Sequence, residues 1–385
     1  MIDIVVVLRA EDAVLDFLSV LDAAQGQEVH VLCGDAVKQI ALPAESDLTE
    51  RLALLAGYVR PVDEAAASPG PKALAALIER SAAGRPARLW THSPADNRRS
   101  RGQLGRDAAA AGHGLPVQHA VGYSPFLQFS SDLDRPLDRA RIRAKLDFVN
   151  RHCGHLLRTE SPQHRIETAR VPATERFFTA DADERERLFA LLASLDDAAA
   201  SVDDPWEFAT SAYEQERLDA TTAWISGMCA PDDGPLIEVG ACEGALTDRL
   251  AGKGFTVDAT EPNPLFHRRL AEHVGPGVRV HQNDLEALAA EPRLPGAAYL
   301  LIEMLYYGQD LDLLDGLPTD LVFIALEPEA LAARLRPWLE TSAVWDRTAE
   351  TQLVFPALES VCGGRAFLSK RGSVGVLLRR RTASR

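Results

Sequence analysis

The feature that most limits the fold of this chain is the alternation of strands with helices, which occurs in two separate series. A strand that is followed by a helix and another strand favours parallel pairing, with the helices packed on the faces of the sheet. The first series therefore predicts one parallel α/β sheet. Its strands and helices are expected, in chain order, at residues 2–8, 12–24, 28–33, 73–83, 88–92, 101–111, 117–121 and 141–156.

The second series follows a predicted helix at residues 213–227 and ends close to the C-terminus. After its last long strand, short segments at 367–369 and 374–379 flank polar residues, and this arrangement predicts a closing β-hairpin. The predicted fold class is α/β, with two doubly wound, Rossmann-like domains, the second with a terminal β-hairpin. The earlier strands of this series are expected at residues 236–239, 256–260, 278–281, 298–302 and 321–326.

A charged, Ala-rich helical stretch at residues 180–200 separates the two series, and Pro205 with its polar neighbours interrupts it. The chain has 385 residues, which suggests two domains at roughly 100–200 residues each. The predicted organisation is a first domain at residues 1–178, a helical linker at 179–203 and a second domain at 204–385.

The charge and the apolar pattern limit the expected partners. The net charge of −15 is opposite to what a phosphate-binding surface needs, so no nucleic acid partner is expected. No apolar run reaches the roughly 18 residues of a membrane span. The start reads as a strand containing Asp3 and not as a signal peptide, and the five scattered cysteines fit a reducing cytoplasm. We expect a cytoplasmic protein with a small-molecule partner, and the oligomeric state is not encoded.

A glycine-rich turn, Glu238-Val239-Gly240-Ala241-Cys242-Glu243-Gly244, joins the first strand of the second series to the following helix. Glycines let the backbone approach a ligand closely, and the start of a helix presents free N–H groups. Glu261 ends the next strand about twenty residues later, where a carboxylate accepts hydrogen bonds from ribose hydroxyls. The turn lacks the spaced glycines of dinucleotide-binding proteins and the lysine of a P-loop. These features predict a nucleoside cofactor of another kind.

Polar residues also follow the third and fourth strands of this series. Asn283 and Asp284 come after the third strand, where an amide or an acid reaches an adenine amino group. Glu303, Tyr306 and Tyr307 come after the fourth strand. Because ligands of open α/β sheets bind at the carboxyl ends of the strands, we expect both groups at one edge of the sheet. The second group supplies candidate catalytic residues that orient or deprotonate a nucleophile.

Four segments resemble the class I methyltransferases that use S-adenosylmethionine (SAM), and more narrowly the nodulation N-methyltransferase (NodS) group: residues 204–208, 213–214, 237–240 and 303–307. The resemblance extends over about residues 204–380 and implies a class I methyltransferase fold with SAM as cofactor. The cofactor-binding residues that it implies are Trp206 and Tyr213 on a segment folded over SAM, Glu238, Gly240, Cys242 and Gly244 in the turn near its methionine part, Glu261 with Pro262 at the ribose, and Asn283, Asp284 and Leu285 at the adenine.

Some of these residues have structural explanations that the sequence leaves open. Glu238 lies within an apolar strand, where a buried acid paired with an arginine is the alternative. For Trp206 the alternative is simple packing. Of the adjacent Tyr306 and Tyr307, one must face away from the site if the segment is extended, and it would then belong to the core.

Weaker motifs in residues 1–175 resemble the PIG-L/LmbE zinc de-N-acetylases. In that family two histidines and an aspartate bind zinc, and a second aspartate acts as a base. Here both histidine positions hold arginine, which cannot bind a metal ion; Asp12 remains and Glu11 stands at the base position. We therefore expect a deacetylase-like domain without a metal, in which arginines form ion pairs with these acids. The motifs are residues 5–12, 28–31, 91–92 and 98–106.

The sequence thus predicts an enzyme, a SAM-dependent methyltransferase. Because deacetylation exposes the amine of an amino sugar, the first hypothesis is N-methylation of an amino sugar or a sugar-containing natural product. The alternatives are O-methylation of a sugar or other secondary metabolite, a bifunctional deacetylase and methyltransferase, and a non-catalytic binding protein. No residue distinguishes N-methylation from O-methylation at this stage.

Overall fold

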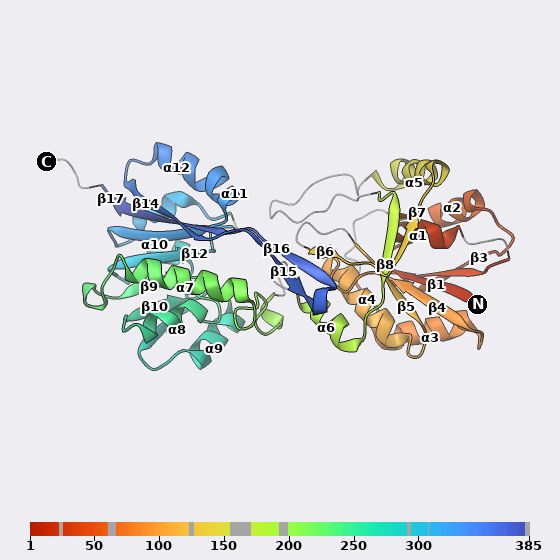
Figure 1. Cartoon of the computed structure of the whole chain (residues 1–385), viewed down its shortest axis with the longest axis horizontal. Coiled ribbons are helices and arrows are strands. Elements are labelled where there is room, and N and C mark those ends of the chain that lie inside the picture. Colours follow the sequence, from red (N-terminus) through yellow and green to blue (C-terminus); the bar gives the residue numbers. More distant parts are fainter. Residues whose placement is uncertain are drawn as a thin grey trace. The chain divides into compact units, whose positions relative to one another are not determined.

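The chain divides into two compact units in the computed structural model (Figure 1). The first unit comprises Met1–Ala199 and Ser360–Leu368, and the second comprises Ala200–Glu359 and Ser369–Arg385. Each unit contains a seven-stranded sheet of Rossmann-like strand order, which confirms the predicted α/β class. The structure describes residues 1–22, 26–60, 67–122, 127–154, 171–191, 199–290, 294–306 and 308–381.

The sheet of the first unit has the strand order β3-β2-β1-β4-β5-β8-β7. The central strand β1 pairs in parallel with β2 and β4, whereas β3, β7 and β8 are paired antiparallel. The elements up to residue 201 are β1 (Ile2–Val7), α1 (Ala10–Leu21), β2 (Val29–Cys33), β3 (Lys38–Leu42), α2 (Leu48–Ala56), α3 (Pro71–Ala82), β4 (Ala87–Thr91), α4 (Arg99–Ala111), β5 (Val117–Ala120), β6 (Leu127–Phe129), β7 (Leu133–Pro136), α5 (Arg139–His152), β8 (Thr174–Phe178), α6 (Ala182–Ala190) and η3 (Ala199–Ser201).

Helices cover both faces of this sheet. Val5 and Val7 of β1 pack in one cluster with side chains of α1, α2 and α5, while Ile4 and Val6 pack in another with α3 and α4. Successive side chains of a strand point to opposite faces, so a strand covered on both sides is apolar throughout. This explains why the Val-rich start of the chain predicted a strand.

The antiparallel strands of the first unit were not predicted from the sequence. β3 has alternating exposed and buried residues, and β7 is four residues long with every side chain at least partly exposed. Such short edge strands lack the apolar run by which the buried parallel strands are recognised.

The sheet of the second unit has the order β11-β10-β9-β12-β13-β17-β14, with parallel pairing from β11 to β13 and an antiparallel β17. The elements from residue 212 onward are α7 (Ala212–Ser226), η4 (Pro231–Asp233), β9 (Leu236–Val239), α8 (Ala245–Gly252), β10 (Val257–Thr260), α9 (Pro264–His273), β11 (Val278–His281), α10 (Leu285–Ala290), β12 (Ala298–Ile302), η5 (Leu311–Gly316), β13 (Leu321–Leu326), α11 (Pro328–Ala330), η6 (Leu331–Leu335), α12 (Arg336–Thr341), β14 (Trp345–Val354), β15 (Ala357–Val361), η7 (Cys362–Gly364), β16 (Ala366–Lys370) and β17 (Ser373–Arg380).

Two apolar clusters lie on the two faces of the second sheet (Figure 1). Leu236 and Leu300 pack with side chains of α7, α8 and α9, whereas Ile237 and Leu301 pack with α10, η6 and neighbouring segments. The direction of the strand order reverses between β9 and β12, since β10 and β11 lie on one side and β13 on the other. In open α/β sheets the ligand site lies outside the carboxyl ends of the strands at this point.

The predicted terminal hairpin between residues 367–369 and 374–379 is wrong. β17 is paired antiparallel along both edges, with β13 and β14, so it has no free edge for β16. β16 instead lies between β15 and β6 in a three-stranded sheet. The physical reason is the length of the competing partner, because β14 offers ten residues for pairing and β16 only five.

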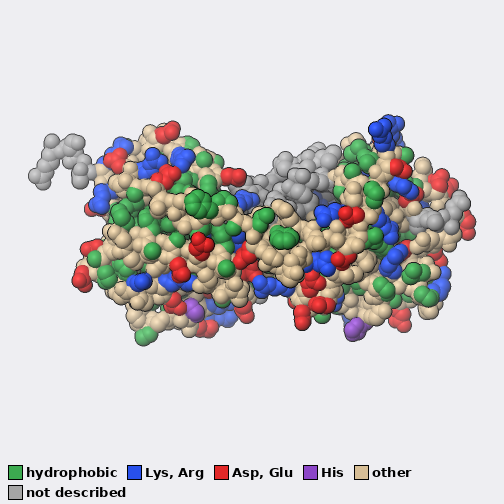
Figure 2. All heavy atoms as spheres, in the orientation of Figure 1, with side chains coloured by type: hydrophobic (Ala, Val, Ile, Leu, Met, Phe, Trp, Pro, Cys, Tyr) green, Lys and Arg blue, Asp and Glu red, His purple; other side chains and the backbone are tan. Residues whose placement is uncertain are grey.

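The length of the helices and the distribution of surface charge relate to the predictions about membrane and nucleic acid partners. Within the described segments, no helix combines the length and apolar character that a bilayer crossing requires. On the face of the molecule seen in Figure 2, acidic and basic side chains are interspersed.

Candidate functional site

The turn from β9 to α8 has an unusual backbone. Gly240, Cys242 and Gly244 all have positive φ angles, of 72°, 53° and 89°. A Cβ atom at Gly244 would lie 2.8 Å from Leu270 Cδ1 and 2.9 Å from Val274 Cγ1, so this position requires glycine. Cys242 adopts the left-handed region without being a glycine, which costs on the order of 1 kcal/mol or more. Strain of this kind concentrates at functional sites.

Glu261 joins this turn to the end of β10. Its carboxylate is 6% exposed and accepts the N–H of Cys242 at 3.0 Å and the N–H of Asn263 at 2.9 Å. Burial raises the pKa of Glu261. An ionised carboxylate has about four acceptor positions, so the two backbone bonds leave capacity for two hydroxyl groups.

Glu238 lies beneath the same turn. It is 5% exposed and accepts a hydrogen bond of 2.6 Å from the hydroxyl of Thr247 on α8. Burial raises the pKa of Glu238 to about 7. Its hydrogen-bond partner in the described structure is therefore a threonine and not an arginine, and the pair ties β9 to α8 below the glycine turn.

An aromatic cluster precedes α7. The ring of Trp206 stacks on Phe208 with centroids 5.9 Å apart, and it meets Phe266 of α9 at 5.3 Å. Trp206 is half-buried, and so part of its indole stays accessible beside these rings.

Polar contacts hold this segment against the glycine turn. The carboxylate of Asp204 accepts the N–H of Phe208 at 2.7 Å, and the backbone N–H of Asp204 donates to Glu243 at 3.4 Å. Arg269 of α9 donates to Glu243 at 2.8 Å and to the carbonyl of Val202 at 2.8 Å. Residues 202–208 and the turn that follows β9 therefore form one connected structure.

The residues predicted at the adenine lie at the start of α10. Asp284 is exposed and accepts the N–H of Ala287 at 2.7 Å, and Leu285 is 2% exposed within the core. The side chain of Leu285 therefore packs in the apolar core of the second unit. Asn283 is half-buried and Pro262 is exposed after β10.

Glu303 follows β12 and has a positive φ of 55°. Its carboxylate accepts a hydrogen bond from the hydroxyl of Tyr306 and one of 2.5 Å from the hydroxyl of Ser373. The Tyr306 oxygen also accepts the N–H of Glu327 at 2.8 Å. Burial and the charges of Glu303 and Glu327 raise the pKa of Tyr306, so it remains a proton donor. Tyr307 lies outside the described residues.

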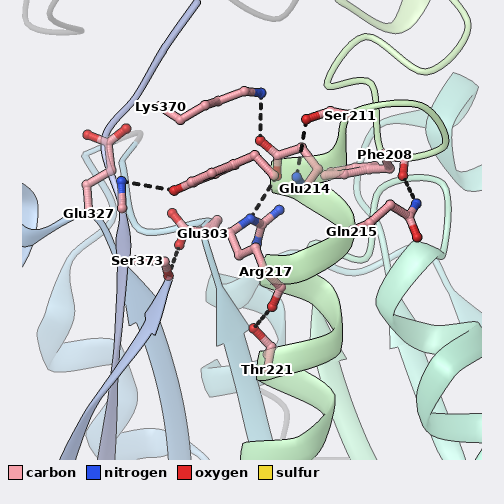
Figure 3. A network of polar contacts seen from close by, with 12 residues as sticks. Phe208, Ser211, Glu214, Gln215, Arg217, Thr221, Glu303, Glu327, Lys370 and Ser373 are labelled. Atoms are coloured by element: carbon pink, nitrogen blue, oxygen red, sulfur yellow. Dashed lines mark hydrogen bonds and ion pairs between the residues drawn. The ribbon is translucent and has the colours of Figure 1, made fainter. Parts of the chain in front are cut away.

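Charged side chains of α7 lie on one side of Glu303, as Figure 3 shows. Arg217 donates to Glu214 at 2.8 Å, and Lys370 forms an ion pair of 2.9 Å with the other oxygen of Glu214. Burial alone would lower the pKa of Arg217, but the charges of Glu303 and Glu214 raise it. The predicted residue Tyr213 accepts the N–H of Gly372 at 2.9 Å.

Ser373, Arg217 and Lys370 were not predicted as site residues. Glu214 and Arg217 are three positions apart on one helix, which is the local spacing that predicts such a pair. Ser373 and Lys370 have no local signal, because they reach the site only through the position of β17.

The turns after β9 and β12 adjoin, as expected at a point where the strand order reverses. A Cβ atom at Gly240 would lie 3.4 Å from Cβ of Met304. The predicted cofactor side around Glu261 and the predicted acceptor side around Glu303 thus belong to one sheet edge.

A second cluster of buried charges lies at the corresponding edge of the first unit. Arg101 forms an ion pair with Asp12 and lies 3.5 Å from Asp16 and 3.7 Å from Asp96. Burial alone would raise the pKa of Asp12, but Arg101 and His92 hold it well below its usual range. The predicted ion pair between an arginine and Asp12 is confirmed.

Two further residues of this prediction have their own contacts or charge environment. The guanidinium of Arg99 donates to the carbonyl of Phe189 and lies over its ring. Burial and the charge of Asp12 raise the pKa of Glu11 to about 7. Over the described parts of the chain, no group of three or more His, Cys, Asp or Glu side chains has the arrangement of a metal site.

Comparison with known proteins bears on the second unit. Residues 192–331 match the family described as Nodulation protein S (NodS). No curated protein matches the chain. Among solved structures, the chain is similar to the N-methyltransferase NodS from Bradyrhizobium japonicum WM9 in complex with S-adenosyl-L-homocysteine, at 16% identity and a TM-score of 0.36, covering 48% of this chain and 95% of that one.

It is also similar to the glycopeptide N-methyltransferase MtfA complexed with S-adenosyl-L-methionine, at 12% identity and a TM-score of 0.32, covering 42% of this chain and 93% of that one. The family match falls on the sheet whose strand order reverses beside Gly240 and Glu303. The chain is therefore NodS-like over residues 192–331, and the protein is a SAM-dependent methyltransferase.

Proposed function

We propose that this protein transfers a methyl group from SAM to the amine of an amino sugar or of a sugar-containing natural product. The NodS match supports the transfer itself. The observation that favours an amine is the environment of Glu303. Its hydrogen-bond partners among the described residues are the uncharged hydroxyl groups of Tyr306 and Ser373, and its negative charge, which also acts on Arg217, is proposed to attract an ammonium group.

The residues on the cofactor side are suited to SAM. Glu261 retains acceptor positions for the two ribose hydroxyls after it has bound two backbone N–H groups. Gly240 has no side chain, so the backbone of the turn is open to a ligand. The half-buried Trp206 offers an aromatic surface on the segment that is bonded to this turn. When bound, SAM supplies an electrophilic methyl group.

The residues on the acceptor side bind and orient the amine. Glu303 attracts the ammonium form, and Tyr306 fixes the carboxylate through its hydroxyl. The nitrogen must lose a proton before it attacks, and Glu303 with adjacent solvent accepts that proton. Most of the rate enhancement then comes from holding the nitrogen in line with the methyl carbon.

The proposal includes the first unit as a deacetylase-like domain without a metal. The guanidinium of Arg101 lies among Asp12, Asp16 and Asp96, where a cation would otherwise balance their charges. A guanidinium cannot activate water, so this unit is proposed to have lost hydrolysis. An amino sugar is the acceptor that links a unit of this kind to an N-methyltransferase.

The test uses the purified full-length protein, methyl-labelled SAM and two matched sugars, glucosamine and N-acetylglucosamine. We expect a labelled N-methyl product from glucosamine and none from N-acetylglucosamine, detected by mass spectrometry. Labelled hydroxyl groups on both sugars would indicate O-methylation instead. Release of acetate from N-acetylglucosamine would indicate a bifunctional enzyme, and SAM binding without transfer to any amine would contradict the proposal.

A variant of Glu303 tests the residue assignment. Glu303→Gln keeps the shape and removes the charge, so kcat should fall by about 100-fold while the Kd for SAM stays within about twofold. Glu340→Gln, on the exposed side of α12, is the matched control and should leave both values unchanged. Wild-type kcat in Glu303→Gln would remove this residue from the mechanism.

A further inference from the structure

Four consecutive residues, from the last residue of β16 to the first of β17, each contact a different group on the acceptor side of the second unit. The contacts come from two side-chain ammonium or guanidinium groups, one backbone N–H and one hydroxyl. They are Lys370 Nζ to Glu214 at 2.9 Å, Arg371 to Glu327 at 3.0 Å, the N–H of Gly372 to the Tyr213 hydroxyl at 2.9 Å, and the Ser373 hydroxyl to Glu303 at 2.5 Å.

The partners of this 370–373 segment come from three separate elements. Tyr213 and Glu214 lie in the first turn of α7, Glu303 follows β12, and Glu327 follows β13. Figure 3 shows Lys370 above Glu214 and Ser373 beside Glu303, with Arg217 between the two carboxylates. The segment therefore connects α7 to the carboxyl ends of the two strands that border the acceptor side.

The segment is held at several points. After it Val374 pairs with both Leu326 and Gln352, and within it the N–H of Gly372 donates to the Tyr213 hydroxyl. Gly372 has a φ of 85°, and a Cβ atom there would lie 3.1 Å from the carbonyl oxygen of Val354. A segment anchored in this way presents its side chains at fixed positions.

We propose that the 370–373 segment is a positioning element for methyl transfer, in which Ser373 holds the carboxylate of Glu303 toward the acceptor amine and Lys370 holds α7 beside it. This inference rests on the proposed function of the same site. Ser373 and Lys370 act through Glu303 and Glu214 and are not catalytic residues themselves.

The backbone conformation of Glu303 supports a positioning role for Ser373. Glu303 has a left-handed conformation that a residue other than glycine adopts only when its surroundings enforce it. The Tyr306 bond is local, three residues away, whereas the Ser373 bond spans 70 residues and joins Glu303 to another strand. Ser373 is fully buried, so water cannot replace its hydroxyl.

The argument for Lys370 is charge balance at the start of α7. Glu214 is buried between Arg217 and Lys370, and these two cations hold its pKa below the usual range even though burial opposes them. Without Lys370, Arg217 would remain as the only direct ion-pair partner of Glu214 in the described structure. The start of α7 would then keep only the bond from the N–H of Gly372 to the Tyr213 hydroxyl among the contacts described above.

The first experiment compares Ser373→Ala with wild type in the full-length protein, with glucosamine and SAM as substrates. We expect kcat to fall about tenfold and its pH profile to differ from that of the wild type, because the carboxylate has lost one of its two hydrogen-bond donors. The KM for SAM should stay within about twofold. Ser373→Thr retains the hydroxyl and should restore most of the loss.

A second readout does not depend on turnover. Hydrogen exchange at residues 303–306 should be about tenfold faster in Ser373→Ala, with and without S-adenosylhomocysteine. Lys370→Met should speed exchange at residues 212–215 in the same way, and Lys370→Arg should not. These exchange measurements test the positioning role of the segment even if glucosamine is not the acceptor. A failure of the positioning role can therefore be told apart from a failure of the proposed function.

The controls are Ser81→Ala and Lys253→Met. Ser81 is a fully buried serine of the first unit that donates to the carbonyl of Leu77, and Lys253 is exposed after α8. Both should leave the pH profile and the exchange at residues 303–306 unchanged. If Ser373→Ala lowers stability but matches Ser81→Ala in both readouts, the segment is only structural and the inference is overturned.

Discussion

At Glu261, one carboxylate accepts the N–H of Cys242 at 3.0 Å and that of Asn263 at 2.9 Å. Both oxygens therefore accept a backbone N–H, and we propose that the remaining acceptor positions bind the ribose. A glutamine at this position would place its NH2 group against a backbone N–H. In this proposal, the geometry of the turn and the binding of the cofactor depend on the same pair of oxygens.

The expected consequence is that Glu261→Gln weakens SAM binding by at least about tenfold, which corresponds to about 1.4 kcal/mol. Isothermal titration calorimetry with the full-length protein measures this directly. Glu286→Gln on α10, which is exposed, is the control and should bind SAM like wild type. An unchanged Kd in Glu261→Gln would show that the ribose is held elsewhere.

Glu238 predicts a specific pH dependence of stability. Burial raises its folded-state pKa from 4.5 to about 7, so between these values the folded chain holds a proton that the unfolded chain has released. By linkage, this group makes the protein less stable as the pH rises from about 4.5 to about 7, by roughly 3 kcal/mol in total, with no further change above.

Glu238→Gln imitates the protonated acid and should remove this contribution. Without SAM, urea unfolding at pH 8 should find the variant more stable than wild type, and at pH 4 the two should be similar. If the free energy of unfolding depends on pH in the same way in wild type and in Glu238→Gln, then Glu238 is not the group responsible for this pH dependence.

At the scale of elements, α7 depends on its packing against β17. The ring of Trp224 on α7 lies so close to Gly375 that a Cβ atom there would be 2.8 Å from Trp224 Cζ3, and the same ring meets Phe323 of β13 edge-on at 4.9 Å. This contact sets the distance between the helix and the sheet. It therefore also sets where Glu214 and Arg217 lie relative to Glu303.

Gly375→Ala should force the ring or the helix to move and should destabilise the second unit by about 1–3 kcal/mol. It should also reduce methyl transfer, because α7 shifts. The control is Gly252→Ala at the end of α8, where no atom lies within 4 Å of the added Cβ and stability should be unchanged or slightly higher. Chemical denaturation followed by tryptophan fluorescence compares the two.

At the scale of the whole molecule, the two units have separate sheets and separate apolar clusters. Unfolding is then not expected to be a single two-state transition. The buried charges of Asp12 and Arg101 belong to the first unit alone. Removing one partner leaves the other buried and unpaired, which is far more costly than the loss of an exposed pair.

Arg101→Met should therefore destabilise the first unit by about 3–5 kcal/mol. Calorimetric unfolding of the full-length protein should show an earlier first transition, and SAM binding should stay at the wild-type Kd. Arg85→Met, which removes the exposed ion pair with Glu28, should leave the stability close to that of the wild type, because solvent screens an exposed pair. Equal effects of the two variants would show that the Arg101 cluster is not a structural centre.

The sequence by itself determined the features that depend on neighbouring residues. The buried parallel strands β1 and β9, the glycine turn at Gly240 and the acid Glu261 after the next strand all follow from local periodicity and spacing. Residues that pack on both sides must be apolar, and a tight turn beside a helix must contain glycine, so these properties appear directly in the order of the residues.

Only the tertiary structure decided which distant segments meet. β17 pairs with β13 and β14 and not with the adjacent β16, and this pairing brings Ser373 to Glu303 across 70 residues and Lys370 to Glu214 across 156. Short polar edge strands and single hydroxyl or ammonium groups have no periodic signal. Their positions depend on competition among whole strands for free sheet edges, which local sequence does not record.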